Sequence, residues 1–402
     1  MVGRFLHPFT SPSRTEHLRV VRGEGSLIFD DTGKEYVDAM AALWFANVGY
    51  GRQEVVDAIA TQAARLHTYH AFDPFTMDPA DELAERIAAI GPVDDPRVFF
   101  TCSGSEAIDT AIKLARAAHQ RAGDGDRQIV VSRGSGYHGT NLGGTSAQGL
   151  DANKIGWGDL APHFVQVPSH DIEAMSRLFA EQGDRIAAVV SEPVQGAGGV
   201  IPPVEGYWPA LRRLCDDHGA FLVADEVICG FGRLGTWFGS ERYGVRPDLM
   251  TFAKGVTSGY VPLGGVVVGQ RVREPLEADP AFVLKHGYTY SGHATACAAA
   301  NACLDVTEAE GLLDRTKVLG DRLRAGLASL VDDGLYADLR GEGLIWALQT
   351  HEDQAPPEVR NRALDHGAVV RPLVAAIAFC PPLVITEEQI DRVVDAVAAA
   401  AR

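Results

Sequence analysis

The sequence is poor in basic residues and has no long apolar run. Its 402 residues include 36 Lys and Arg against 53 Asp and Glu, which gives a formal net charge of −17. Nucleic acids and anionic membrane surfaces are bound through basic faces, so we expect neither as a partner. No segment approaches the roughly 20 apolar residues of a membrane-spanning helix. The first ten residues also lack the pattern of a signal peptide. We therefore expect a cytoplasmic protein with small-molecule substrates.

Motifs for metal and hydrolase chemistry are missing as well. The six cysteines form no C-x-x-C pair and have no histidine at zinc-site spacing. Scattered cysteines of this kind are typical of reduced thiols. The sequence contains no H-E-x-x-H motif, no P-loop and no G-x-S-x-G elbow. We expect no metal site, and metal-dependent, nucleotide and serine hydrolases are disfavoured.

Short apolar runs alternate with helical segments through the middle of the chain. The runs are Arg97–Thr101, Gln128–Ser132, Ile186–Ser191, Phe221–Ala224, Leu249–Ala253 and Gly265–Gly269. This alternation predicts an α/β fold whose mostly parallel sheet is covered by helices on both faces. In such sheets ligands bind at the carboxyl ends of the strands.

The two ends of the chain have a different pattern. Thr295–Leu330 predicts one long helix or two, followed by strands near 343–348, 368–370 and 383–385 and a closing helix over 387–400. Leu27–Val37, with a turn at Asp31-Thr32-Gly33, predicts a hairpin that packs on this C-terminal part. We expect a large domain over 46–280 and a small α+β domain formed by 1–45 and 281–402.

Residues that can take part in catalysis or ligand binding follow the predicted strands of the sheet. They are Ser103-Gly104-Ser105 at a helix start, Tyr137-His138 in a glycine-rich turn, Glu192, Asp225 and Lys254. A helix start can bind a phosphate, although capping by Ser103 or Ser105 explains the serines equally well. Singly, Asp225 and Lys254 are also explained by a structural salt bridge.

The set as a whole indicates one cofactor. Pyridoxal phosphate needs a phosphate site, a ring that stacks on it, an acid for its pyridine nitrogen and a lysine for a Schiff base. Only six of the 36 basic residues are lysines, and Lys254 is the one that directly follows a predicted strand of the sheet. Burial there would lower its pKa and make the amine nucleophilic.

With these residues in their order, the sequence resembles the class III aminotransferases, which are pyridoxal-phosphate enzymes of fold type I. The resemblance covers nearly the whole chain. Its motifs are SGSEA (103–107), YHG (137–139), EPVQGAGGV (192–200), LVADEVICGFGRLG (222–235), PDLMTFAKGVTSGYVPLGG (247–265) and TYSGH (289–293).

The resemblance implies a role for each site residue. Lys254 would carry the Schiff base and move the proton, and Asp225 would pair with the pyridinium nitrogen. Tyr137 and Val227 would pack on the two faces of the ring. The family's active sites are shared in a homodimer, which implies a dimer here or a tetramer, with Thr289 completing a phosphate site across the interface. The cofactor-binding set is Ser103, Gly104, Ser105, Tyr137, His138, Glu192, Asp225, Val227, Lys254 and Thr289.

Within the family the sequence is most similar to ω-transaminases of the amine:pyruvate type. Arg371 stands ten residues before Pro381-Pro382, at the position of the mobile arginine of that group. The substrate-binding set implied by the resemblance is Trp44, Phe72, Tyr137 and Arg371. We expect apolar residues to receive the amine and Arg371 to receive the carboxylate of an α-keto acid.

Several alternatives stay open. The Glu–Arg switch of the GABA and ornithine enzymes is replaced by Ala197 and Ala378, and Phe45 and Thr140 depart from the diaminopelargonate synthases. Diaminopelargonate transaminase and β-alanine or GABA:pyruvate transaminase remain alternatives, as do a racemase or aminomutase of the same fold and a non-catalytic binding protein. The stretch over 151–170 is abbreviated relative to the group, which leaves the substrate range open.

Overall fold

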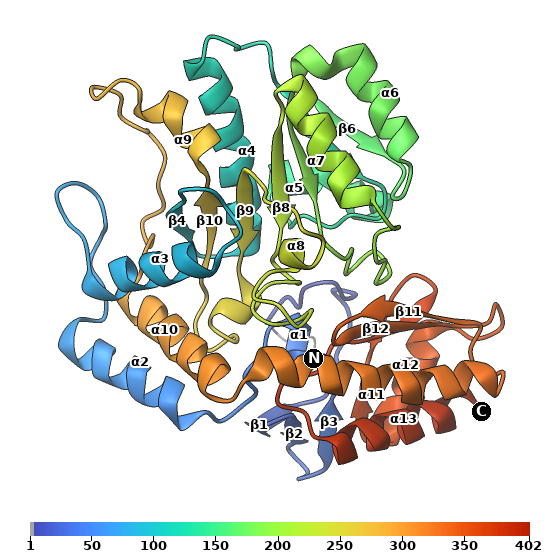
Figure 1. Ribbon diagram of the computed structural model, residues 1–402. Helices are drawn as coiled ribbons and strands as arrows, with labels where there is room; N and C mark the ends of the chain where they lie inside the picture. Colours follow the sequence, from blue (N-terminus) through green and yellow to red (C-terminus); the bar gives the residue numbers. More distant parts are fainter. Residues whose placement is uncertain (1–3) are drawn as a thin grey trace.

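The computed structural model describes residues 4–402 and is built around a seven-stranded sheet (Figure 1). Across the sheet the strands are β4 (Arg97–Thr101), β10 (Gly264–Val268), β9 (Leu249–Phe252), β8 (Phe221–Asp225), β7 (Ile186–Ser191), β5 (Ile129–Arg133) and β6 (Phe164–Val167). β10 is antiparallel to both of its neighbours, and every other neighbouring pair is parallel. The predicted mostly parallel sheet is confirmed.

Helices cover both faces of this sheet. One buried cluster joins α4 (Gly104–Arg121) and α9 (Gln270–Glu277) to one side of the strands. A second cluster joins α3 (Asp78–Ile90), α6 (Ile172–Gln182), α7 (Tyr207–His218) and α10 (Ala294–Ala309) to the other. Because both faces are buried, the strands are almost continuously apolar, which is the pattern that the sequence displays.

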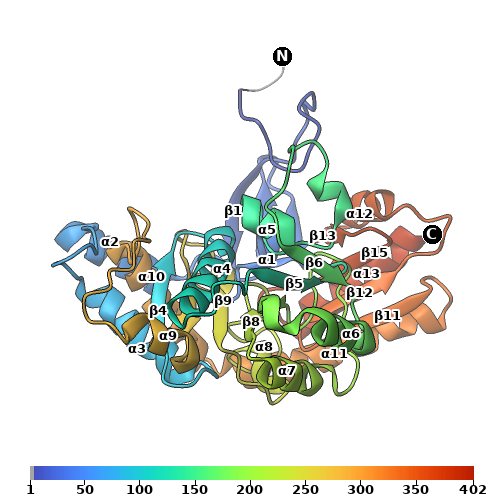
Figure 2. The same ribbon diagram turned by 90° about the horizontal axis from the view of Figure 1, so that it is seen from above.

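A four-stranded sheet joins the two ends of the chain. It consists of β1 (Val20–Glu24), β2 (Leu27–Asp30), β3 (Glu35–Asp38) and β13 (Ala368–Val369), with β13 parallel to β3 (Figure 2). The predicted hairpin is therefore confirmed, and it pairs with a C-terminal strand. The domain boundaries near residues 45 and 280 stay a prediction.

A second small sheet contains β11 (Asp338–Glu342), β12 (Ile345–Gln349), β15 (Ala376–Phe379) and β14 (Arg371–Pro372). The predicted strand at 383–385 is wrong, and β15 was not predicted. Pro381 and Pro382 have no N–H to donate to a ladder, and the N–H of Leu383 donates to the carbonyl of Asn47 at 2.8 Å. The buried residues after the prolines therefore lie in a turn.

The remaining helices surround these sheets. The long segment after 293 is two helices, α10 and α11 (Leu312–Asp332), separated at Gly311, whose φ is +58°. The others are α1 (Ala41–Trp44), α2 (Gln53–Leu66), α5 (Leu142–Ala147), α8 (Gly239–Arg242), α12 (Pro356–Asp365) and α13 (Glu387–Ala401), with 3-10 turns at Asp151–Lys154, Gly183–Arg185 and Lys254–Val256. Among the described helices, none is long and apolar enough to cross a bilayer.

Candidate active site

A cavity of about 120 Å³ lies at the carboxyl ends of the central strands. Eight of the residues predicted for the cofactor line it: Gly104, Ser105, Tyr137, His138, Glu192, Asp225, Val227 and Lys254. They follow β4, β5, β7, β8 and β9, so residues up to 150 positions apart in the sequence meet at one edge of the sheet. Sequence reasoning did not single out four further lining residues, Ile108, Gly139, Ile228 and Ala253, all of which lie close to predicted ones in sequence.

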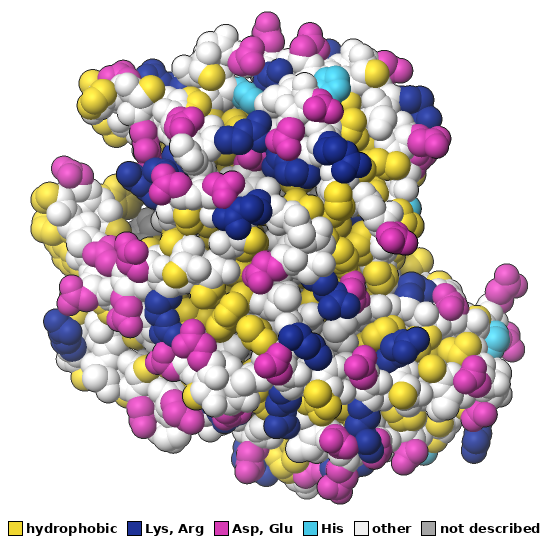
Figure 3. Space-filling view, in the orientation of Figure 1, with side chains coloured by type: hydrophobic (Ala, Val, Ile, Leu, Met, Phe, Trp, Pro, Cys, Tyr) yellow, Lys and Arg dark blue, Asp and Glu magenta, His cyan; other side chains and the backbone are white. Residues whose placement is uncertain are grey.

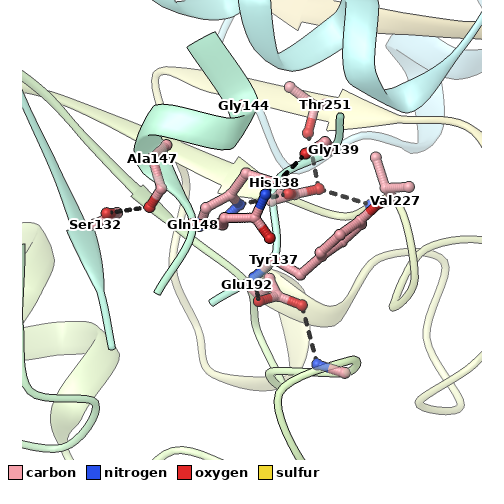
Figure 4. Close-up of polar contacts among 12 residues, drawn as sticks. Ser132, Tyr137, His138, Gly139, Gly144, Ala147, Gln148, Glu192, Val227 and Thr251 are labelled. Carbon is pink, nitrogen blue, oxygen red and sulfur yellow. Dashed lines mark hydrogen bonds and ion pairs between the residues drawn. The ribbon is translucent and has the colours of Figure 1, made fainter. Parts of the chain in front are cut away.

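Asp225 is held by three donors at the end of β8 (Figure 4). Its Oδ2 lies 2.8 Å from Nδ1 of His138, and its Oδ1 accepts from Oγ1 of Thr251 at 3.1 Å and from the N–H of Val227 at 3.2 Å. Only 4% of Asp225 is exposed. The sequence did not indicate the bonds from His138 and Thr251, which cross between strands. Together they fix a buried carboxylate at the cavity wall.

Lys254 begins the 3-10 turn after β9. Its φ of +48° lies in the left-handed region, which side chains with a Cβ rarely adopt and which is common at functional sites. Burial lowers the pKa of its amine, while the charges of Asp225 and Glu192 oppose that effect. The lowered pKa increases the fraction of neutral amine, which is the nucleophilic form.

Glu192 follows β7 and accepts two backbone N–H groups. Oε1 accepts from Tyr137 at 3.0 Å and Oε2 accepts from Gly196 at 2.9 Å (Figure 4). Burial raises the pKa of Glu192, and His138 and the two N–H donors oppose this. The carboxylate thereby ties the loop after β5, which carries Tyr137, to the loop after β7.

The start of α4 provides a site for an anion. The first N–H groups of a helix have no partner within it, and the helix dipole is positive there. Gly104 and Ser105 line the cavity, and Oγ of Ser105 accepts the N–H of Thr140 at 3.0 Å. Ser103 is placed differently: it does not line the cavity, and its Oγ accepts the N–H of Glu106 at 3.2 Å as the helix N-cap. A Cβ on Gly104 would lie 2.9 Å from Val227, so only glycine fits there.

Besides Ser103, four predicted residues do not line this cavity: Trp44, Phe72, Thr289 and Arg371. Trp44 is buried, and its ring packs close to Gly196. A Cβ added to Gly196 would lie 2.3 Å from the indole. Phe72 is 52% exposed and packs beside Gly287, and Thr289 is also exposed. The structure of one chain therefore does not bring Phe72 or Thr289 to the cavity.

Arg371 begins β14 and is partly buried near the cavity. Burial raises the pKa of Tyr137, and the positive charge of Arg371 opposes this effect. The pKa of Arg371 itself is lowered by burial, and no carboxylate contributes to its environment among residues 4–402. A partly buried guanidinium without an acidic partner is suited to an anionic ligand.

These features fit the pyridoxal phosphate that the sequence predicts. The cavity presents a fixed carboxylate, an amine of lowered pKa and the positive end of a helix. Pyridoxal phosphate, an aromatic aldehyde with a phosphate group, requires these three. Asp225 would lie at the pyridine nitrogen, Lys254 at the aldehyde, and Gly104 and Ser105 at the phosphate.

Comparisons with known proteins identify the family. The family model "Aminotransferase class-III" matches residues 9–401. Putrescine–pyruvate aminotransferase of Pseudomonas aeruginosa is 37% identical and covers 97% of this chain and 92% of its own.

Solved structures agree as well. An amine transaminase from an uncultivated Pseudomonas species, in its PLP-bound form, has a TM-score of 0.95 at 37% identity and covers 99% of this chain and 98% of its own. A thermostable ω-transaminase variant engineered for asymmetric synthesis of enantiopure bulky amines has a TM-score of 0.93 at 33% identity, covering 98% and 96%. The predicted fold type I is confirmed, and the chain belongs to the class III aminotransferases.

Proposed function

We propose that this enzyme moves an amino group from a primary amine or ω-amino acid to pyruvate or another α-keto acid, with pyridoxal 5′-phosphate as cofactor. The observation that carries the proposal is the convergence of Lys254 and Asp225 on one cavity, next to the unpaired Arg371. When bound, the cofactor supplies the carbonyl that exchanges the amino group and a ring that withdraws electrons.

The chain's own residues hold and orient this cofactor. Asp225, fixed by three hydrogen bonds, would pair with the ring nitrogen. Val227 and Tyr137 would pack on the ring, and the start of α4 would hold the phosphate.

Lys254 moves the proton in each half-reaction. Its amine lies in a buried cavity and has a lowered pKa, so it would accept a proton from the substrate carbon that bears the amino group and pass it to the cofactor carbon that takes up that group. Glu192 fixes the backbone of Tyr137, and so keeps the tyrosine ring at the cavity that Lys254 also lines.

Arg371 and Trp44 receive different substrates. The guanidinium binds the carboxylate of the keto acid, and a bidentate pair of this kind is strong where water is excluded. Trp44, buried beside Gly196 and Ile228, gives the amine substituent an apolar wall. The relatives named for putrescine–pyruvate and amine transamination support this division.

We also propose that Phe72 and Thr289 act in the cavity of a second subunit. Both are exposed here, and Tyr69 and Phe75 beside Phe72 are exposed aromatics as well. In the bulky-amine variant the replaced tryptophan and phenylalanine are separated by the same number of residues as Trp44 and Phe72. This supports a shared pocket in a homodimer.

The two half-reactions test the function separately. Purified enzyme is mixed with putrescine, β-alanine, GABA, 1-phenylethylamine or the diaminopelargonate precursor pair, and loss of the cofactor's band at about 410–430 nm is followed. We expect loss with at least one amine, recovery with pyruvate, and neither in Lys254→Ala. Conversion without any keto acid would instead indicate the isomerase.

A further inference from the structure

A second, larger cavity of about 690 Å³ lies beside Arg371. We name it the N-terminal cavity. It is bounded by the segment before β1, by β1 to β3, and by α12, which lies beside these strands (Figure 2). Its polar lining includes Arg14, His17, Arg22, Asp38, Arg360 and Asn361.

The N-terminal cavity adjoins the proposed substrate site on two sides. Val369 and Val370 line it, and Arg371 follows them directly. The helix α12, which carries Arg360, packs against β14, which carries Arg371. The short helix α1 lies between the two cavities, since Ala42 and Phe45 line the N-terminal cavity whereas Trp44 packs beside Gly196.

Among residues 4–402, the lining of this cavity carries more positive than negative charge. Asp38 is its one lining carboxylate within residues 4–402, and its two oxygens already accept from the N–H groups of Met40 and Ala42 and from the hydroxyl of Tyr50. Arg22 pairs with Glu24 at 2.8 Å.

Arg14 and Arg360 have only neutral partners. Nε of Arg14 donates to the carbonyl of Glu16 at 2.8 Å, and Nε of Arg360 donates to Oδ1 of Asn361 at 2.7 Å. Burial lowers the pKa of Arg360 and the charge of Arg14 lowers it further, while Arg360 acts in the same way on Arg371. Arg360 therefore lies near both Arg14, with which it lines the cavity, and Arg371.

This arrangement is unusual for a chain with a net charge of −17. Over the face in Figure 3, acidic and basic side chains alternate without a large patch of either sign. Clustered charge of one sign in a cleft raises the local concentration of counter-ions. An anion bound beside Arg360 would offset the unfavourable interaction with its neighbouring arginines.

We propose that the N-terminal cavity is an anion site, in which Arg14 and Arg360 hold the carboxylate of an α-keto acid next to Arg371. The choice of an α-keto acid as the ligand rests on the proposed function. The site would raise the local concentration of a carboxylate substrate in an enzyme whose net charge is −17.

Direct binding of pyruvate tests the site. The enzyme loaded with pyridoxal phosphate has no amino group to give, so pyruvate binds without reacting, and its dissociation constant is measured by saturation-transfer NMR or calorimetry. We expect Arg360→Gln and Arg14→Gln each to raise this constant about 3- to 10-fold at low salt. The differences should shrink at about 0.5 M salt, where screening is strong.

Two controls separate charge from packing. Arg213→Gln removes the same charge from an exposed position on α7 and should leave pyruvate binding unchanged. Arg360→Lys keeps the charge and should retain most of the affinity. Equal effects of Arg360→Gln and Arg213→Gln, or equal loss in Arg360→Lys and Arg360→Gln, would overturn the site.

The anion site and the proposed function can fail separately. If the wild-type enzyme exchanges no amino group, and Arg360→Gln still binds pyruvate more weakly than the wild type does, the anion site stands and the proposed transamination fails. If exchange proceeds and both glutamine variants bind pyruvate as the wild type does, the transamination stands and the anion site fails.

Discussion

Ionisable side chains around the cavity differ in their partners, and these partners decide what each can do. Asp225 accepts three hydrogen bonds, which fix the orientation of its buried carboxyl group. Lys254 is surrounded by buried atoms, and its amine pKa is lowered. Arg371 is partly buried, and no carboxylate contributes to its environment among residues 4–402. The first two are suited to hold and use a cofactor, and the third to bind a substrate.

Replacing Arg371 with alanine should affect one half-reaction far more than the other. Charge-assisted hydrogen bonds contribute about 1.5–3 kcal/mol each, so kcat/KM for pyruvate should fall roughly 10- to 100-fold. The amine half-reaction should change little. Stopped-flow measurement of each half-reaction checks this, and equal losses in both would refute a dedicated carboxylate role.

Glu226, next to Asp225, should make stability depend on pH. It is fully buried, accepts the N–H groups of Gly239 and Ser240, and burial raises its pKa from 4.5 to about 7. The native state therefore binds this proton more tightly than the unfolded chain does. The stabilisation is complete below pH 4.5 and is lost as the pH rises through about 7.

Thermal unfolding of the wild type and of Glu226→Gln between pH 5 and 8 measures this effect. The wild type should lose stability relative to the variant as the pH rises, since the amide does not ionise. Parallel curves over this range would show that Glu226 does not titrate there.

At the scale of secondary structure, the start of α4 combines a structural and a chemical role in adjacent serines. Ser103 caps the helix by accepting the N–H of Glu106, whereas Ser105 lines the cavity. The sequence left both roles open for both serines. The fold separates them because the N-cap side chain turns back over the first turn of the helix.

Alanine at each serine should therefore give different results. Ser103→Ala should lower the free energy of unfolding of the cofactor-free protein by about 1 kcal/mol, with little change in cofactor affinity. Ser105→Ala should weaken pyridoxal phosphate binding roughly 10-fold and change the unfolding less. Chemical denaturation and cofactor titration measure the two quantities. The reverse pattern would assign the phosphate to Ser103.

Predicted elements failed where prolines and short strands interrupt the pattern. The apolar residues after Pro381 and Pro382 resembled a strand, yet their N–H groups bond to loops. β15, directly before the prolines, was missed because its Ala-rich sequence is not typical of a strand. The predicted strands of the central sheet, by contrast, agree with the observed ones within one residue at each end because each is a compact apolar run, although the edge strand β6 was not predicted.

For the whole molecule, exposed aromatic residues indicate where a second subunit would bind. Tyr69 and Phe75 meet edge to face at 5.1 Å and Phe72 packs beside Gly287, with roughly half of each aromatic side chain exposed. Val283 and Tyr290, on the segment that carries Gly287, are also exposed. Clustered exposed apolar side chains are typical of interaction surfaces.

Phe72→Asp should therefore weaken the proposed homodimer and the activity together. A charge buried in an interface costs several kcal/mol, which is enough to dissociate many dimers. Light scattering after size exclusion measures the mass. Val374→Asp, at another exposed apolar position, is the control and should stay dimeric. A Phe72→Asp enzyme that is dimeric and active would contradict the shared pocket.

The sequence by itself determined the order of the chemical groups and the sheet that carries them. Each group follows its own apolar strand, and parallel strands place their carboxyl ends at one edge, so Ser105, Tyr137, Glu192, Asp225 and Lys254 were predicted together. Local pattern was sufficient because each prediction concerned a residue and its own strand.

Only the tertiary structure decided which of these groups touch. The bonds of Asp225 to His138 and Thr251, and the bonds of Glu192 to Tyr137 and Gly196, fix the geometry of the site. The pairing of β3 with β13 brings Arg14 and Arg360, from opposite ends of the chain, into one cavity. No local pattern carries this information, because contacts between distant segments depend on how whole elements pack.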